Sequence, residues 1–219
     1  MSNACIITGT DTDVGKTVFA AMLMLALDAN YWKPVQCGVA EGVDTKAIQR
    51  MTGLPEERFF PEAYIFSEAC SPHLASEIDG VTIDFDRLFL KKEMMRDVAP
   101  LLIEGAGGLM VPLSRDVLQI NHFKKTGLPV ILCARTGIGT LNHTLLSLEA
   151  LRVREIPIHG IAFIGEENTD NMRTVAEFSG ERILGRLPIL AEVNERTLME
   201  AFAENFRLKD FVMPRGEAA

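Results

Sequence analysis

The sequence predicts an α/β fold in which a mostly parallel sheet carries helices on both faces, with residues 1–219 as a single domain. Three observations predict it. Short, nearly continuous apolar runs alternate with helix-forming stretches, which is typical of strands buried on both faces. A Gly-containing loop ending in Gly-Lys-Thr joins the first apolar run to the first helix. The length fits one domain with a substantial core.

The elements follow in order from these patterns. In the first half of the chain we expect a strand at 4–8, a helix at 16–30, a short strand at 31–35, a helix at 44–52, a Pro- and Glu-rich connection, a helix at 85–98 and a buried strand at 101–103. In the second half we expect a helix at 117–125, a strand at 129–134, a helix at 141–152, a strand at 158–164, a helix at 169–179, a strand at 182–190 and a last helix from 196.

Three unusual loops each follow a predicted strand. Their sequences are "GTDTDVGKT", "KPVQCGVAEGVD" and "EGAGG". In open parallel sheets, ligands bind beyond the carboxyl ends of the strands. All three loops should therefore project from one edge of the sheet, where we expect the functional site.

Composition and charge exclude several classes of function. Hydrophobic residues make up 47% and charged residues 24%, which is typical of a globular protein rather than a disordered one. The net charge is -8 and the basic residues form no stripe, so nucleic acid is not an expected partner. No apolar run approaches the ~20 residues of a spanning helix, and no secretory signal is visible, so we expect no membrane partner and a cytoplasmic location.

The cysteines and histidines do not indicate a disulfide or a metal site. Cys5, Cys37, Cys70 and Cys133 lie far apart, and no pair has C-x-x-C spacing. We expect reduced thiols, with Cys5 and Cys133 acting as small apolar side chains in strands. The histidines lack the neighbours that a metal site requires.

The first loop departs from the strict phosphate-binding pattern G-x-x-x-x-G-K-[ST]. Thr10 stands where the first glycine should be, and Gly9 lies one residue early. A loop between a buried strand and a helix still directs backbone N–H groups and the positive end of the helix dipole to one point. Lys16 would then reach the β- and γ-phosphates of a nucleotide, and the Thr17 hydroxyl would ligate Mg²⁺. The alternative is an ordinary strand-to-helix turn, but the position and flanking elements favour a P-loop NTPase-like domain.

Two acids and a second lysine follow the other strands. Glu104 is the only acid after "PLLI", where a Mg²⁺-triphosphate site usually has a carboxylate. Asp44 is a further candidate, although its place at a helix start explains it equally well. Lys33 faces the same edge and suggests chemistry on an anion. From the sequence alone, the better interpretation is a lysine that keeps its ammonium in water.

Together these motifs resemble those of the dethiobiotin synthetase family. The matching pieces run along most of the chain: "TGTDTDVGKT", "KPVQCG", Asp44, "SPHLA", "EGAGGLMVPL", "GTLNH" and "LGRLPILAE". The resemblance implies an ATP-dependent cyclo-ligase of biotin biosynthesis, which joins CO₂ to 7,8-diaminononanoate and forms dethiobiotin, ADP and phosphate. It also implies ATP as co-substrate, Mg²⁺ as cofactor and a homodimer with the site at the subunit interface.

The same resemblance implies roles for individual residues. Lys33 and Lys16 would be catalytic, because they place fixed positive charge where negative charge develops. Thr17, Asp44 and Glu104 would hold Mg²⁺. ATP contacts would come from Asp13, Val14, Gly15, Lys16, Thr17, Val18, Asp44, Glu104, Gly105, Ala106, Gly107, Pro188, Ile189, Leu190 and Glu195. Thr12 and Cys37 would contact the diamine end of the substrate, and the other subunit would bind its carboxylate through Gly139, Thr140, Leu141 and Asn142.

Three positions depart from the family pattern. Cys37 stands where Ser or Thr is common, which exchanges a good hydrogen-bonding hydroxyl for a weak thiol. Asp13 replaces a more usual Glu. Ile164 and Gly165 stand where an Asn commonly contacts adenine, so the sequence leaves the preferred base open.

Two other kinds of nucleotide-binding protein remain as alternatives. A switch ATPase of the partitioning type usually has an additional lysine early in the phosphate loop, and residues 10–12 offer none. Many small-molecule kinases carry an arginine-rich lid, and no such cluster is visible in the sequence.

Overall fold

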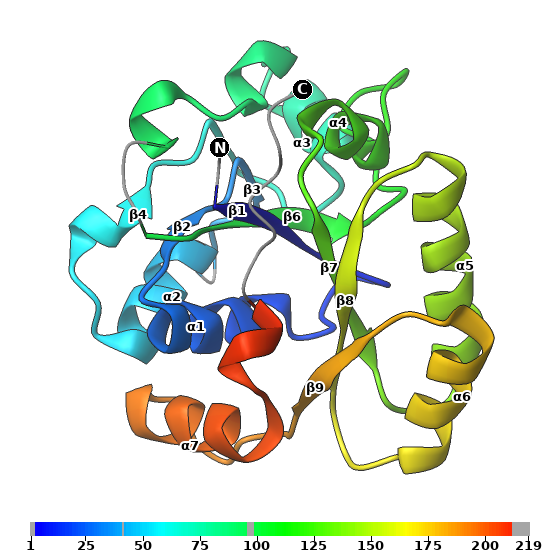
Figure 1. The fold of residues 1–219 in the computed structure, drawn as a ribbon. Helices are drawn as coiled ribbons and strands as arrows, with labels where there is room; N and C mark the ends of the chain where they lie inside the picture. Colours follow the sequence, from blue (N-terminus) through cyan, green and yellow to red (C-terminus); the bar gives the residue numbers. More distant parts are fainter. Residues whose placement is uncertain (1–2, 41, 96–98, 212–219) are drawn as a thin grey trace.

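The computed structural model describes residues 3–40, 42–95 and 99–211, and its central feature is a seven-stranded sheet (Figure 1). The strand order is β4-β2-β6-β1-β7-β8-β9, and the paired strands run parallel. The strands are β1 (Ala4–Gly9), β2 (Asn30–Trp32), β4 (Phe59–Phe60), β6 (Leu101–Gly108), β7 (Val130–Arg135), β8 (Ile158–Ile164) and β9 (Ile183–Leu187). A separate parallel pair is formed by β3 (Val35–Cys37) and β5 (Tyr64–Phe66).

Helices cover both faces of the sheet, as the sequence predicts (Figure 1). On one face lie α1 (Lys16–Leu27), α2 (Asp44–Thr52) and α7 (Glu195–Asn205); on the other lie α4 (Gln119–Thr126), α5 (Thr140–Val153) and α6 (Thr169–Ser179). The short α3 (Pro72–Ile78) packs beside β3 and β5, and 3-10 helices occur at η1 (Glu56–Arg58), η2 (Phe85–Leu88), η3 (Lys92–Met95) and η4 (Leu208–Phe211).

Strand alternation separates two main cores. Along β1, Cys5 and Ile7 pack toward α1, whereas Ala4 and Ile6 pack toward α4. Both Cys5 and Cys133 are buried, and all four thiols are free, as expected. The α/β class predicted from the apolar runs is therefore confirmed.

The topology places a crevice at the carboxyl end of β1. The chain leaves β1 into α1 on one face, and it leaves the neighbouring β7 into α5 on the opposite face. Such a reversal between adjacent strands is where open parallel sheets bind ligands.

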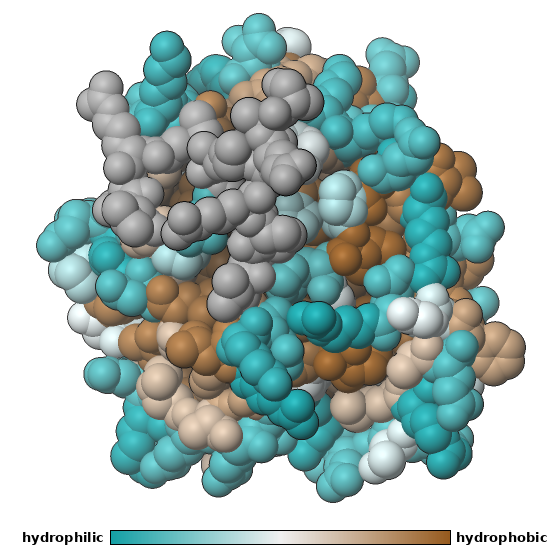
Figure 2. Space-filling model, viewed as in Figure 1, coloured by the Kyte–Doolittle hydropathy of each residue, from teal (hydrophilic) through white to brown (hydrophobic). Residues whose placement is uncertain are grey.

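The outer surface is mixed in character. On the face shown in Figure 2, hydrophobic side chains form several patches that hydrophilic side chains separate. Among the described residues, no helix is both long and apolar enough to span a membrane.

The strand expected at 31–35 is divided between two sheets. β2 ends at Trp32, and the chain resumes as β3 at Val35. Pro34 has no N–H to donate to a ladder, and its carbonyl accepts from Ala63 N and Tyr64 N at 2.9 and 3.0 Å. This break lets Lys33 leave the sheet toward the crevice.

The helix expected at 85–98 does not form over its described part. The segment contains η2 and η3, and residues 96–98 lie outside the described residues. The Leu88 carbonyl, which a continuous helix would use internally, instead accepts from His122 Nε2 at 3.1 Å. Arg87 is likewise anchored outside the segment, because its Nη2 donates to Ala63 O at 2.8 Å. Tertiary contacts thus replace the helical ladder.

Two further elements differ in extent. The first helix ends at Leu27 rather than continuing to Asn30, because Asp28 adopts a left-handed conformation with φ of 50°. The strand expected at 101–103 is longer in the structure: β6 continues through Gly108, so "EGAGG" lies within a strand rather than in a loop. By contrast, the helices at 44–52 and 169–179 and the strand at 158–164 have the predicted bounds.

Candidate active site

The loop after β1 folds back on itself at the mouth of the crevice. Lys16 Nζ donates to the Asp11 carbonyl at 3.0 Å, and Thr12 N donates to the Asp11 carboxylate at 2.7 Å. Lys16 is 6% exposed, and this burial lowers the pKa of its ammonium, partly offset by the charge of Glu104. The lysine therefore lies at the entrance of the crevice with little solvation.

The glycines explain how this loop differs from the strict pattern. A Cβ at Gly9 would lie 2.6 Å from Val14 Cγ1 and 2.8 Å from the Asp11 carbonyl, so the tight passage falls at residue 9 rather than residue 10. Gly15 has φ of 96°, and a Cβ there would lie 2.9 Å from Ile164 Cγ2. The loop is therefore packed directly against the end of β8.

A buried carboxylate organises the centre of the site. Glu104 is 1% exposed, and its Oε1 accepts from Thr17 Oγ1 at 3.0 Å and from Lys33 Nζ at 3.3 Å. Its Oε2 accepts from the Tyr31 hydroxyl at 3.0 Å. Burial, followed by the charge of Glu104, holds the pKa of Tyr31 well above its ordinary value, so the phenol remains a donor.

Lys33 does not keep its ammonium in water, so the preferred interpretation from the sequence was wrong. The residue is 6% exposed, and its ammonium forms ion pairs with Asp44 and Glu104. Burial by itself lowers the pKa of Lys33, but the two carboxylates outweigh it and hold the pKa above its ordinary value. The lysine thus carries a fixed positive charge inside the site.

Asp44 points into the site rather than capping its helix. Its carboxylate pairs with Lys33, and its backbone N–H donates to Gln36 Oε1 at 3.2 Å. The first residue of α2 therefore serves the crevice, although a negative charge there also suits the helix dipole.

The oxygen atoms in this cluster fit a magnesium ion. One hydroxyl and two carboxylates converge, and Mg²⁺ is bound through oxygen, usually by one or two carboxylates with phosphates and water. In the structure, the Lys33 ammonium forms ion pairs with both Glu104 and Asp44. These two carboxylates therefore bind one positive charge between them. Thr17 comes within 3.0 Å of Glu104, which joins the end of β6 to the first turn of α1.

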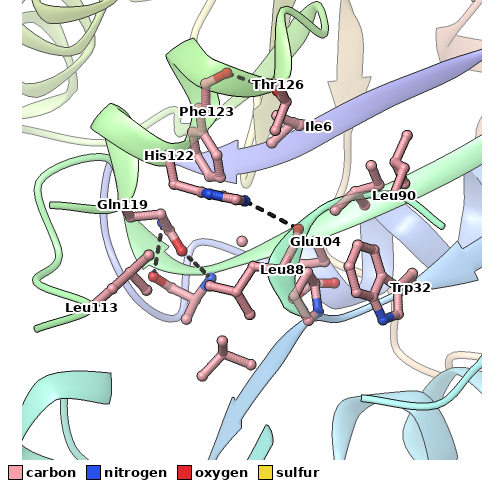
Figure 3. Close-up of a pocket in the computed structure, with 15 residues that line it drawn as sticks. Ile6, Trp32, Leu88, Leu90, Glu104, Leu113, Gln119, His122, Phe123 and Thr126 are labelled. Atoms are coloured by element: carbon pink, nitrogen blue, oxygen red, sulfur yellow. Dashed lines mark hydrogen bonds between the residues drawn. The ribbon is translucent and has the colours of Figure 1, made fainter. Parts of the chain in front are cut away.

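The segment after Glu104 is held from the α4 side. The Gln119 amide accepts from Ala106 N at 2.8 Å and donates to Ala106 O at 3.1 Å (Figure 3). It also donates to Gly108 O at 3.0 Å. A Cβ at Gly105 would lie 2.8 Å from Phe123 Cζ. The glycine at 105 is thus required by packing against α4.

Gly107 lies on the opposite side of this segment, next to the first loop. It has φ of 65°, and a Cβ there would lie 3.2 Å from Thr12 Oγ1. Thr12 itself is exposed at the mouth of the crevice. Cys37 is half-buried at the end of β3, and burial raises the pKa of its thiol to about 12, with Lys33 acting weakly in the opposite direction. Thr12 therefore lies next to Gly107, and Cys37 lies close enough to Lys33 to interact with its charge.

The remaining expected contacts follow strands farther along the sheet. Gly139 caps α5 with φ of 90°, and Leu141 and Asn142 follow it in the first turn. The Thr140 side chain is buried, and its hydroxyl donates to Arg135 O at 2.5 Å, so that side chain is already engaged. Pro188, Ile189 and Leu190 follow β9, and Glu195 is exposed at the start of α7.

The sequence interpretation missed three residues. Tyr31 lies in the buried strand β2, two positions before Lys33. Residues two apart in extended chain point to the same side, and this spacing was the available signal for Tyr31. Arg135 ends β7 at the same edge, and its Nη2 donates to Thr12 O at 3.0 Å. Gln119 gave no local signal, because its partners lie in another element.

Comparisons with known proteins identify the family of this chain. A family model described as an AAA domain matches residues 3–197. An ATP-dependent dethiobiotin synthetase BioD of Rhodopseudomonas palustris (strain HaA2) is 52% identical over 97% of this chain and 98% of its own length. The protein of the same name from Afipia carboxidovorans is 51% identical over 96% of this chain and 99% of its own length.

A solved structure supports the fold. A ParA family ATPase from Chlorobium tepidum TLS aligns with a TM-score of 0.52 and 14% identity, covering 99% of this chain and 95% of that chain. At this identity the likeness concerns the fold alone. The identity to the curated relatives extends over nearly their whole length, and the chain therefore belongs to the dethiobiotin synthetase family.

Proposed function

We propose that this chain catalyses the ATP-dependent closure of 7,8-diaminononanoate and CO₂ to dethiobiotin, with release of ADP and phosphate. One observation carries the proposal: at the mouth of the first loop, one oxygen of Glu104 accepts from both the Thr17 hydroxyl, at 3.0 Å, and the Lys33 ammonium, at 3.3 Å. This arrangement suits phosphoryl transfer to an anion, where catalysis depends mainly on positioning and fixed charge.

The reaction divides into three balanced steps. An amine of the substrate adds to CO₂ and loses a proton, giving a carbamate. A carbamate oxygen attacks the γ-phosphorus of ATP and the bond to ADP breaks, which leaves a carbamic–phosphoric mixed anhydride. The second amine then attacks the carbonyl carbon, loses a proton and expels phosphate, which closes the cyclic urea.

The chain's own residues supply charge and position for these steps. Backbone N–H groups of the first loop, from Asp13 through Val18, would hold the triphosphate at the helix N-terminus. Lys16 would contact the β- and γ-phosphates. Lys33, held by two carboxylates, would stabilise the carbamate and the charge that develops on the transferring group.

Thr17, Asp44 and Glu104 would hold Mg²⁺. When bound, this ion neutralises charge on the phosphate oxygens of ATP. Because the Lys33 ammonium contacts both Glu104 and Asp44, it would lie beside the metal ion, where the carbamate and the γ-phosphate would meet.

The far end of the substrate would be bound by a second subunit. Leu141 and Asn142 lie in the first turn of α5, whose positive dipole end suits a carboxylate. Because the Thr140 hydroxyl is engaged internally, backbone N–H groups would provide this contact. Ile138, immediately before this turn, is fully exposed, as expected of a residue that a partner covers. We therefore propose a homodimer with the site at its interface. We also propose that the protein acts in the cytoplasm.

The decisive test is a reaction with purified protein, ATP, Mg²⁺, ¹³C-labelled bicarbonate and the diamine. We expect ADP release that depends on the diamine, together with a cyclic urea that carries one labelled carbon by mass spectrometry. ADP release that is equally fast without the diamine would show that the assignment is wrong. Omission of bicarbonate provides the control for carbon transfer.

A further inference from the structure

Tyr31 occupies a special position relative to Glu104. Its hydroxyl donates to Glu104 Oε2 at 3.0 Å, whereas Thr17 and Lys33 both contact the other oxygen, Oε1. Tyr31 is 0% exposed and Glu104 is 1% exposed, so water cannot readily replace this hydrogen bond. The two oxygens of one carboxylate therefore have separate partners.

The phenol is held rigidly from several directions. Tyr31 lies in β2 between two strands, with Leu102 of β6 and Phe59 of β4 as its partners in the sheet. Its ring meets Phe59 edge-on at a centroid distance of 6.2 Å. A side chain fixed in this way restricts the rotation of any carboxylate to which it donates.

Without this donor, the carboxylate would have other options. Glu104 could turn both oxygens toward the ammonium of Lys33, which lies 3.3 Å from Oε1. Bidentate pairing with Lys33 would turn Oε1 away from the Thr17 hydroxyl, the other oxygen of the proposed metal site that contacts it. Groups that orient a metal ligand in this manner typically change metal affinity about 10- to 100-fold when they are removed.

We propose that Tyr31 is a positioning residue that holds Oε2 of Glu104, so that Oε1 alone is presented to the metal and the triphosphate. The inference rests on the proposed magnesium site of Thr17, Asp44 and Glu104. It gives Tyr31, on the face of β2 that packs against α1, the role of fixing the orientation of Glu104.

The test is Tyr31→Phe, which removes the hydroxyl and keeps the ring. Binding of Mn²⁺, a spectroscopic substitute for Mg²⁺, is measured by electron paramagnetic resonance with a non-hydrolysable ATP analogue present. We expect Mn²⁺ affinity to fall about 10- to 100-fold. We also expect the Mg²⁺ concentration for half-maximal rate to rise similarly, while the rate at saturating Mg²⁺ changes only a few-fold.

The chain offers a matched control in Tyr64, its other tyrosine. Tyr64 is also buried, and its hydroxyl accepts from Asp84 N at 2.8 Å, beside β3 and β5. Tyr64→Phe should lower the urea midpoint of unfolding and leave Mn²⁺ affinity unchanged. If Tyr31→Phe behaves in the same way, Tyr31 only packs and the inference is overturned.

A double-mutant cycle with Glu104→Gln separates the two proposals. If Tyr31 acts through Glu104, adding Tyr31→Phe to Glu104→Gln should cause no further loss of Mn²⁺ affinity. If Tyr31→Phe causes the same loss of Mn²⁺ affinity in the Glu104→Gln background as in wild type, the positioning role is overturned while the metal assignment remains intact. If Glu104→Gln alone leaves Mn²⁺ affinity unchanged, the metal assignment itself fails, and the role of Tyr31 fails with it.

Discussion

The two faces of β6 differ sharply at adjacent residues. Glu104 turns toward α1 into a network of hydroxyl and ammonium groups. On the other face, Ile103 lines a largely apolar pocket with about 30 Å³ of free space. In Figure 3, His122 and Phe123 of α4 lie across this pocket from Trp32. Strand alternation thus directs the Glu104 carboxylate and the Ile103 side chain to opposite faces of β6, while Glu104 also borders the pocket.

Two polar side chains of α4 beside the pocket bond to main-chain atoms. Gln119 bonds to Ala106 and Gly108, and His122 bonds to the Leu88 carbonyl. The difference between the faces shows how a buried carboxylate is accommodated: one side supplies charge partners, and the other excludes water. In a water-poor surrounding, fixed charges interact more strongly.

The largest expected effect comes from a substitution on the apolar face of β6. Phe123 is 4% exposed and packs against the backbone of Gly105, so Phe123→Ala should lower the free energy of unfolding by about 3–5 kcal/mol. Urea unfolding measures this change, and Mn²⁺ affinity of the folded protein should stay within a few-fold of wild type. Phe178→Ala, at a residue 77% exposed on α6, is the control and should change stability by less than about 0.5 kcal/mol. A large change in metal affinity for Phe123→Ala would show that the two faces are not independent.

The next largest effect comes from a substitution on the charged face. Lys33→Ala should lower kcat about 10²- to 10³-fold, because it removes a fixed positive charge at the reacting centre. Affinity for an ATP analogue, measured by calorimetry, should remain nearly unchanged. Lys46→Ala, at an exposed lysine paired with Glu56, should leave the rate intact. Loss of ATP binding with kcat preserved would instead assign Lys33 to the nucleotide.

A smaller effect tests the connection between the faces. Gln119→Leu removes three hydrogen bonds to the main chain of β6, so we expect a loss of about 1–3 kcal/mol in stability. The Ala106 amide should exchange its hydrogen faster with solvent. Gln119→Glu keeps an acceptor for Ala106 N but no donor for the two carbonyls, and it should slow that exchange again. Unchanged exchange in Gln119→Leu would contradict the role given to the amide.

The smallest effect is a pH dependence on the apolar face. Burial, followed by Lys125, lowers the pKa of His122 below its ordinary value of 6.5, against an opposing hydrogen bond to Leu88. Between the lowered pKa and 6.5 the unfolded state binds more protons. The contribution to stability is therefore complete above 6.5 and is lost as the pH falls through the folded pKa.

His122→Gln keeps a donor for the Leu88 carbonyl without a titratable ring. Urea unfolding between about pH 7.5 and 5 should show a shallower loss of stability in this variant than in wild type. Parallel curves for the two proteins would mean that His122 does not contribute to acid destabilisation.

Much of the fold and the chemical class follow from local sequence. Alternating apolar runs and helix-forming stretches determine a parallel sheet with covered faces, because burial on both sides requires continuous apolar strands. "GTDTDVGKT" places a phosphate-binding loop at the end of β1, and the positions of Glu104 and Asp44 place acids at the same edge. These features depend on residues close together in the chain, so local sequence patterns predict them.

Only the tertiary structure decided how the central side chains are used. The partners of Glu104 are Thr17, Tyr31 and Lys33, which lie 87, 73 and 71 residues away in sequence. Whether a lysine is solvated or buried depends on such distant groups, and so the sequence alone favoured the wrong state for Lys33. The same reason explains why residues 85–88 form a 3-10 turn: a side chain of α4 binds the Leu88 carbonyl that a longer helix would need. Local pattern set the framework, and contacts between distant segments set the charge and geometry of the site.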